Sequence, residues 1–251
     1  MRIIRLFHNE IFKMKHSRQI KMVSFCVLLF SAFVSVNLKY ERNLMDITEY
    51  GYGAAFEYFR QIAVMLIIFL APMAADMTAR EVDQGTIQIA LSRGVKRGEY
   101  FAVKLICFLG YVTLSTLLGF LVYLVFRTML LGFNPQGLVY PDYLLSVCAY
   151  IAGSLVLLYT YGLLVFCLGY YFDSVAAASF TGIVMLVLDA VVIFRFTPWP
   201  SPVRAADIMY EVLLKEQRIL TMDFVWLLIP FICVCIIFGL LSWVFFRRKD
   251  I

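Results

Sequence analysis

Six long runs of apolar residues constrain what this chain can fold into. A helix needs about 20 residues, each rising ~1.5 Å, to cross the ~30 Å hydrocarbon layer of a bilayer. A membrane barrel would instead show alternating segments of about ten residues, and these runs do not alternate. We therefore predict an all-α integral membrane protein with six transmembrane helices, in the segments 22–36, 61–75, 101–131, 143–172, 174–194 and 224–246.

The amino-acid composition supports the same class. Hydrophobic residues make up 63% of the chain and charged residues 16%, whereas a soluble domain is roughly half apolar and a quarter charged. The net charge is +5, but no segment is long enough to form a basic soluble domain that binds nucleic acid. We therefore expect a lipid membrane, and no nucleic acid, as a partner.

Lysine and arginine residues are unevenly divided among the segments between the runs. The first 21 residues hold six of the 22, the segment between the second and third runs holds five when Lys104 at the start of the third run is included, and the last residues hold three. Cytoplasmic loops retain positive charge, and with six spans both ends of the chain lie on one side. We predict that both termini are cytoplasmic and that residues 195–223 form an extracellular segment.

The first 21 residues carry a helical pattern of their own. Ile4, Phe7, Ile11 and Met14 recur at helical spacing, while the basic residues fall largely on other faces. Such a helix lies in the membrane interface with its lysines and arginines toward anionic headgroups. We predict an amphipathic elbow over residues 1–21 that leads into the first span. A cleaved signal peptide is the alternative, but no small-x-small cleavage site follows the first run.

The residues needed for common catalytic sites are missing. Both histidines, His8 and His16, precede the first run, so the chain cannot supply the two histidines that an intramembrane metalloprotease needs at membrane depth. The six cysteines all lie in apolar runs, where they act as small hydrophobic residues. No G-x-S-x-G elbow and no G-x-x-x-x-G-K-[ST] loop is present. We predict a chain that is not an enzyme and has no metal site and no cofactor of its own.

Residues 79–104 form a dense island of charge and turn residues between the second and third runs. Asp83 or Thr86 can cap a short helix, and Gly94 can end it in a left-handed conformation. A short helix with an apolar face, displayed on the cytoplasmic surface, suits a groove on a partner. The alternative is an ordinary charged loop that follows the distribution of positive charge.

This segment resembles the cytoplasmic signature of the ABC type-2 (ABC-2) permease family, the membrane subunits of ABC exporters. In that family an acid and a Gly-Thr pair lead into a short helix that ends in Leu-Ser, followed by a turn, a basic residue and a lysine that enters the third span. Gly94 stands where many members have a proline. The matching residues are Glu81, Gly85, Thr86, Leu91, Ser92, Gly94, Val95, Arg97, Glu99, Tyr100 and Lys104.

The resemblance implies that residues 1–251 form a single ABC-2 transmembrane domain, a permease subunit that forms the translocation pathway of an ATP-driven exporter. Such subunits pair with a second copy or a paralogue and with two copies of a cytoplasmic ABC ATPase, which binds the ATP and Mg. By this analogy residues 79–99 are a coupling segment. Its residues with an implied role in ATPase coupling are Glu81, Gly85, Thr86, Ile87, Leu91 and Arg97.

The tight connection at Asp173 and Ser174 is similar to a second, smaller ATPase contact in that family. Ser174 is equally well explained as the cap of the helix that follows it, since serine is a favoured N-cap residue. Both readings stay open from the sequence.

Asp189 is the acid that lies deepest in a run. It is about fifteen residues into the fifth run, or roughly 22 Å by helical rise, and a charge at that depth needs a partner. Arg195 is six residues further along, about 240° around the same helix, so it cannot pair simply within that helix. We predict that Asp189 pairs across helices with Arg127 or Arg195, as part of the pathway or as a structural ion pair.

The cargo follows from the resemblance only in outline. The short chain, without an added extracellular domain, is most similar to the drug and antimicrobial-peptide branch, and its aromatic residues also suit a lipid-like amphiphile. The expected location is the plasma membrane of a bacterium, in multidrug or antimicrobial-peptide resistance. A gradient-driven carrier and a non-transporting sensor or scaffold are the alternatives from other classes.

Overall fold

The structure, a computed structural model, describes residues 2–45, 52–131, 140–189, 204–205, 208–209 and 222–249. Over these residues the regular elements are helices, and none of the described residues is in a strand. In chain order the helices are α1 (Arg2–His16), α2 (Arg18–Met45), α3 (Tyr52–Asp83), α4 (Thr86–Ser92), α5 (Arg97–Leu131), α6 (Tyr140–Phe172), α7 (Val175–Leu188) and α10 (Met222–Arg248).

The all-helical membrane class is confirmed. Four helical segments are long and apolar enough to cross a bilayer, and they lie at Arg18–Val36, Arg97–Leu130, Val147–Phe172 and Val225–Arg248. Helix α7 is apolar but shorter, and residues 190–194 of the predicted fifth span lie outside the described residues. Helix α3 has 32 residues, but the burial of its side chains is described only from Ile68 onward. The count of six spans therefore stays a prediction.

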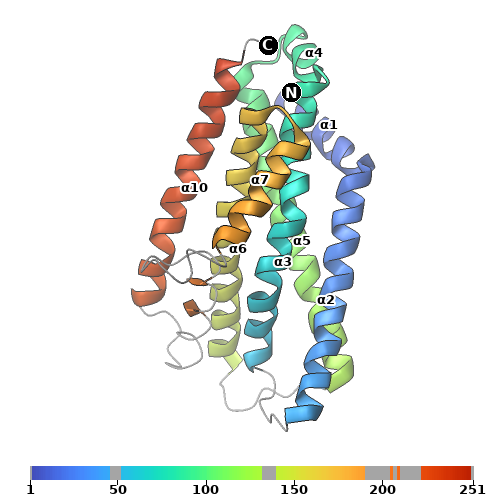
Figure 1. Cartoon of the computed structure of the whole chain (residues 1–251), viewed down its shortest axis with the longest axis vertical. Coiled ribbons are helices and arrows are strands. Elements are labelled where there is room, and N and C mark those ends of the chain that lie inside the picture. The colour runs from blue at the N-terminus through green and yellow to red at the C-terminus, as the bar shows by residue number, and fades with distance from the viewer. Residues whose placement is uncertain are drawn as a thin grey trace.

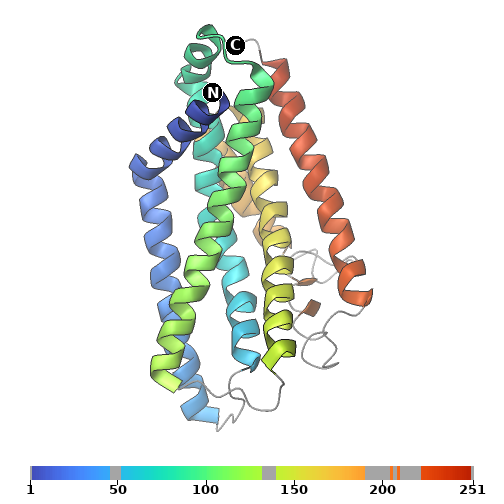
Figure 2. The same cartoon turned by 180° about the vertical axis from the view of Figure 1, so that it is seen from behind.

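Helix α3 lies at the centre of the bundle. It packs against α6, α7, α2 and α5, while α10 stands at one side and α2 at the other (Figures 1 and 2). Its buried face is rich in small residues, including Ala71, Ala74 and Ala75, and a Cβ atom added at Gly169 of α6 would overlap the side chain of Thr78. Small residues let membrane helices approach closely, which accounts for the tight contact of α3 with α6.

The pair of small residues on α7 packs within the subunit. Ala178 and Gly182 are buried, and a Cβ atom added at Gly182 would overlap the side chain of Val165 on α6. Of the two uses that small residues four apart allow, a seam with a second copy or close packing inside one chain, the structure has the second.

One end of the bundle gathers segments that are far apart in the sequence. Helix α1, helix α4, the turn between α6 and α7, and the last turn of α10 all lie there (Figure 1). We call it the basic end, because these segments hold the lysine and arginine clusters of the sequence. The N-terminal helix and the C-terminal end of α10 thus lie at the same end of the bundle, as an even number of spans requires. That this side is cytoplasmic stays a prediction.

Candidate functional site

The island of residues 79–104 is a helical hairpin that projects from the basic end. Gly85 has φ 64° and turns the chain from α3 into α4, and Gly94 has φ 81° and leads from α4 toward α5. The predicted left-handed conformation of Gly94 is confirmed. The predicted side-chain cap of α4 is wrong, because the N-cap residue is Gly85. Thr86 instead donates its hydroxyl to the carbonyl oxygen of Glu81 (3.3 Å), so it stabilises the turn.

Helix α4 turns one face inward and one face outward. Ile87 is only 1% exposed and belongs to the hydrophobic core, and Leu91 is half-buried against it. Ile89 is 53% exposed. We call the exposed residues of α4 and its C-cap the α4 outer face, which consists of Gln88, Ile89, Ser92 and Arg93.

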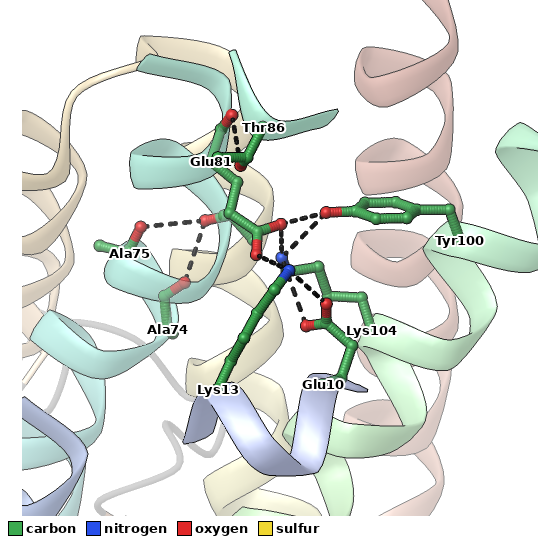
Figure 3. A network of polar contacts seen from close by, with 9 residues as sticks. Glu10, Lys13, Ala74, Ala75, Glu81, Thr86, Tyr100 and Lys104 are labelled. Atoms are coloured by element: carbon green, nitrogen blue, oxygen red, sulfur yellow. Dashed lines mark hydrogen bonds and ion pairs between the residues drawn. The ribbon is translucent and has the colours of Figure 1, made fainter. Parts of the chain in front are cut away.

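Glu81 lies at the centre of a polar cluster beneath this hairpin (Figure 3). Its carboxylate accepts hydrogen bonds from the Tyr100 hydroxyl and the Lys104 ammonium of α5. Lys13 of α1 donates to the second oxygen of the same carboxylate, at 3.1 Å. Glu81 thus joins three helices, and its side chain points into the subunit.

Glu10 of α1 completes the cluster. Its carboxylate lies 2.7 Å from the Lys13 ammonium and 3.7 Å from the Lys104 ammonium. Lys104 is 2% exposed and Glu10 is also buried. We call this cluster of two carboxylates, two ammonium groups and one phenol the ion network; its members are Glu10, Lys13, Glu81, Tyr100 and Lys104.

The charges of the ion network balance. Burying an unpaired ion costs several kcal/mol, roughly, and a buried pair offsets that cost only when each ion keeps its partners. Burial raises the pKa of the Glu10 carboxyl, but Lys104 and Lys13 lower it further, so the pKa lies below its ordinary value. Glu10 is therefore ionised at neutral pH.

A second buried acid pairs beside the network. Arg80 lies 2.6 Å from the Asp76 carboxylate, both on α3. With the amide of Gln19 turned so that both its ends are satisfied, its nitrogen donates to both Asp76 oxygens (2.8 and 2.9 Å) and its oxygen accepts from Arg80 (2.7 Å). This triad ties the start of α2 to α3.

Between these groups lies a cavity of about 350 Å³. Acidic and basic side chains line it together, so its lining does not favour an anion or a cation alone. Within the described parts of the chain, no group of three or more His, Cys, Asp or Glu side chains is placed to hold a metal ion. The lining residues are Glu10, Lys13, Met14, His16, Ser17, Ile20, Asp76, Met77, Arg80, Glu81, Gln84, Thr86 and Lys104.

The sequence motif includes three of the five residues of the ion network and neither of the two on α1. The motif contains Glu81, Tyr100 and Lys104, but nothing in it points to Glu10 or Lys13. A signal was present, because Glu10 is the one acidic residue among the first 40. An isolated acid in a basic interfacial helix is a candidate for a buried pair, and Lys13 is three residues away on the same face.

Arg97 lies apart from the ion network. Its guanidinium donates to the carbonyl oxygens of Arg247 (3.0 Å) and Lys249 (3.2 Å) at the end of α10. The motif places Arg97 in the coupling segment, and the structure places it where that segment meets α10.

The turn at Asp173 and Ser174 is exposed at the basic end. Ser174 is the N-cap of α7, and its hydroxyl oxygen accepts from the Ala177 amide (3.4 Å), so the predicted capping role is confirmed. Asp173 has φ 56°, a left-handed conformation, and its carboxylate contacts the ammonium of Lys249. A second partner contact at this turn stays a prediction.

Asp189 is buried at the C-terminal end of α7. The hydroxyl of Tyr161 on α6 donates to its carboxylate, at 2.6 Å. The sequence did not point to this tyrosine. Arg195 lies outside the described residues, and the side chain of Arg127 is not described either. The predicted arginine pair therefore stays a prediction.

A comparison with known families identifies the family of this chain. A model of a family described as ABC-2 family transporter protein matches residues 6–189, which is more than half of the chain. The match runs from α1 to the end of α7, includes every residue of the ion network and of the α4 outer face, and ends before α10. No curated protein matches the chain.

Proposed function

Because the chain belongs to the ABC-2 family of transporter proteins, as a multi-pass membrane permease of an ABC transporter, we propose that it is the membrane subunit of an ATP-driven exporter. A separate cytoplasmic ATPase hydrolyses the ATP, with Mg. Two copies of that ATPase assemble with this chain and a second permease, either a copy or a paralogue.

The observation that carries this proposal is that the α4 outer face is exposed while the hairpin behind it is bound to the rest of the subunit. Ile89 is an exposed apolar residue among polar neighbours, as expected of an anchor that fills a pocket on a partner. Directly below it, Thr86 and Glu81 tie the hairpin to the ion network. A force applied to α4 therefore reaches α1, α3 and α5 together.

The mechanism follows from these links. Closure of the two ATPases on ATP displaces the α4 outer face. The ion network resists separation of its charges, so the ends of α3 and α5 move as one body with α1. Because α3 packs closely on α6 and α7, the displacement tilts the central helices and opens the pathway outward.

The role of Glu81 in this mechanism differs from that of Ile89. Glu81 is engaged inside the subunit, so it acts by holding the hairpin, while Ile89, Gln88 and Arg93 face the ATPase. Of the other residues carried by the motif, Gly85 shapes the turn, and Ile87 with Leu91 seats α4 on the core.

The cargo we propose is an amphipathic drug, antimicrobial peptide or lipid-like molecule, exported across a bacterial plasma membrane. The buried Asp189 with its Tyr161 partner is a polar site inside the helix bundle. We expect Asp189→Asn to lower export and leave assembly with the ATPase intact. Unchanged export by this variant would show that Asp189 has no role in the pathway.

The test of the coupling role is co-purification with a candidate ABC ATPase, sought first in the genes next to that of this chain, followed by measurement of ATP turnover. We expect Ile89→Glu to weaken the complex on the order of tenfold or more, since anchor residues carry much of an interface's binding energy. Lys96→Glu is the matched control, because Lys96 is also exposed beside α4. Complex formation and turnover that equal the control would overturn the coupling role of α4.

The alternatives predict other outcomes of the same assay. A gradient-driven carrier moves cargo in vesicles that contain no ATPase and responds to a proton or sodium gradient. A sensor or scaffold binds its partner but moves no cargo. Export that needs ATP and the partner separates the proposed function from both.

A further inference from the structure

Helix α10 is peripheral along most of its length but firmly held at its end. Most of its side chains are not buried, and Trp226, Ile236 and Leu240 are among the exposed ones. Phe246, in contrast, is fully buried. Phe231 and Ser242 are also buried, so neighbouring helices enclose single positions along this helix as well as its last turn.

Phe246 sits among aromatic rings from two other helices. Its ring centroid lies 6.0 Å from that of Tyr100 and 5.7 Å from that of Phe101, both at the start of α5. It lies 5.3 Å from that of Tyr170, at the end of α6. Aromatic pairs at these separations contribute stability beyond their buried area, so the end of α10 is bound to both helices.

Arg97 adds a polar link on the α5 side. The last carbonyl groups of a helix have no partner within the helix, and a cation beside them is favourable because the helix dipole is negative there. Arg97 supplies both a donor and a positive charge to the carbonyls of Arg247 and Lys249. Because Arg97 opens α5 directly after the α4 hairpin, it connects that hairpin to α10.

Lys249 adds a polar link on the other side. Its ammonium contacts the carboxylate of Asp173, the residue between α6 and α7. The residue that follows, Ser174, caps α7. The last turn of α10 is therefore joined to the α4 hairpin through Arg97 and to the α6–α7 turn through Lys249.

We propose that this last turn is a clasp that holds the α4 hairpin and the α6–α7 turn in one fixed arrangement. We call it the α10 clasp; its residues are Phe246, Arg247 and Lys249. Arg97 and Asp173 are positioning residues that act through it. The clasp residues on α10 lie outside residues 6–189 that match the family, whereas Arg97 and Asp173 lie inside them.

The consequence for function rests on the proposed coupling to an ATPase. With the clasp closed, the α4 outer face and the exposed turn at Ser174 form one composite surface that an ATPase meets as a unit. Motion of either segment is passed to the other through α10. The geometry of the clasp itself needs no partner and can be tested without one.

The experiment is hydrogen–deuterium exchange with mass spectrometry on the full chain in lipid nanodiscs, with no ATPase present. The informative amides report on each segment: Ala177 and Ala178 on the α6–α7 turn, and Gln88 and Gly94 on the hairpin. Exchange at such amides tracks the free energy of local opening. The readout is the effect of a change in one segment on exchange in the other.

We expect Arg97→Gln to speed exchange at the α6–α7 turn on the order of tenfold, the effect of losing a charge-assisted hydrogen bond. Lys249→Gln should reciprocally speed exchange in the α4 hairpin, because coupling between two sites is mutual. Arg93→Gln is the matched control for Arg97→Gln; Arg93 is an exposed arginine four residues before Arg97, and its replacement should leave exchange at the α6–α7 turn unchanged.

Changes confined to the mutated segment would overturn the clasp. If Arg97→Gln does not insert into nanodiscs, Lys249→Gln and Asp173→Asn provide the same test from the opposite side. Because the sample contains no ATPase, a linked response together with an Ile89→Glu variant that still couples would retain the clasp and reject the function proposed for α4. The opposite pair of results would reject the clasp alone.

Discussion

The ion network and the α10 clasp hold neighbouring parts of the basic end by different means. In the network the charges are buried, and Lys104 is 2% exposed. In the clasp the ring of Phe246 is buried and the ion pair is partly exposed, with 48% of the Asp173 side chain and 16% of the Lys249 side chain exposed. Removing one charge from a buried network is strongly destabilising. An exposed ion pair contributes little stability by itself, so in the clasp the aromatic rings contribute much of the stability.

Tyr100 of the ion network also contacts the clasp. Its ring stacks on Phe246 of the clasp, and its hydroxyl donates to Glu81 of the network. The hairpin is thus bound on one side by charge and on the other by aromatic packing. Variants that remove one kind of interaction and keep the other test how different the two regions are.

The largest effect is expected from Lys104→Met. The variant keeps the length of the side chain but leaves the carboxylates of Glu10 and Glu81 without their buried cation, which costs about 3–5 kcal/mol. Thermal unfolding in detergent micelles measures the loss, with Lys96→Met as the exposed control. A midpoint equal to that of the control would mean that the network contributes no stability.

A smaller loss is expected from Tyr100→Phe. The variant keeps the ring on Phe246 and removes the hydroxyl that Glu81 accepts from, so it separates the two regions at the residue that links them. A hydrogen bond to a charged group contributes roughly 1.5–3 kcal/mol. Chemical unfolding of the wild type and the variant gives the difference in the free energy of unfolding. A loss below this range would mean that Tyr100 stabilises the protein mainly through its ring.

The opposite sign is expected from Tyr170→Phe, whose ring packs against Phe246 of the clasp. The Tyr170 hydroxyl is buried and has no hydrogen-bond partner among the described residues. Removing it keeps the contact with Phe246 and relieves an unsatisfied polar group, so stability should stay unchanged or rise by about 1 kcal/mol. The same unfolding assay decides, and a clear destabilisation would indicate that this hydroxyl does have a partner.

Within the network, Lys13→Met should cost less than Lys104→Met. Lys13 also contacts Glu10 and Glu81, but its side chain is 43% exposed. Exposed ion pairs are worth about 0.2–1 kcal/mol, and salt screens them. Unfolding at low and high salt checks both statements. A loss as large as that of Lys104→Met would show that the partly exposed Lys13 contributes as much stability as the buried Lys104.

The smallest effect concerns pH. The folded-state pKa of Glu10 lies below the ordinary value of 4.5, so its stabilising contribution is present above that value and is lost as the pH falls through the lower folded pKa. The stability difference between the wild type and Glu10→Gln should be the same at about pH 7 and about pH 5, and should shrink only below 4.5. A difference that already shrinks between these two pH values would contradict the lowered pKa.

Local features of the hairpin and the capped turn were predictable from the sequence. Gly94 turns left-handed because a residue without Cβ does so at little cost, and Ser174 caps α7 because its hydroxyl reaches a free amide. The cap of α4 was not predictable in the same way. The left-handed turn at Gly85 takes the N-cap position itself, so neither Asp83 nor Thr86 is used.

Pairings between helices were beyond the sequence. Glu10 meets Lys104, Asp189 meets Tyr161, and Lys249 meets Asp173, each across a long stretch of chain. A side chain's own position says that it needs a partner but does not say which helix supplies one. Charge alone predicts an arginine partner for Asp189, which stays a prediction, but charge does not point to the tyrosine that donates to the same carboxylate.

The sequence by itself determined that this protein is helical and spans a membrane, because the length of an apolar run and the hydrogen bonding of a helix are local properties. It also marked the hairpin at residues 79–104, because turn residues act where they stand. Only the tertiary structure decided which face of α4 is open to a partner, and that α1 and α10 hold the hairpin from opposite sides. Those outcomes depend on how helices pack, and packing sets which charges and rings are enclosed together.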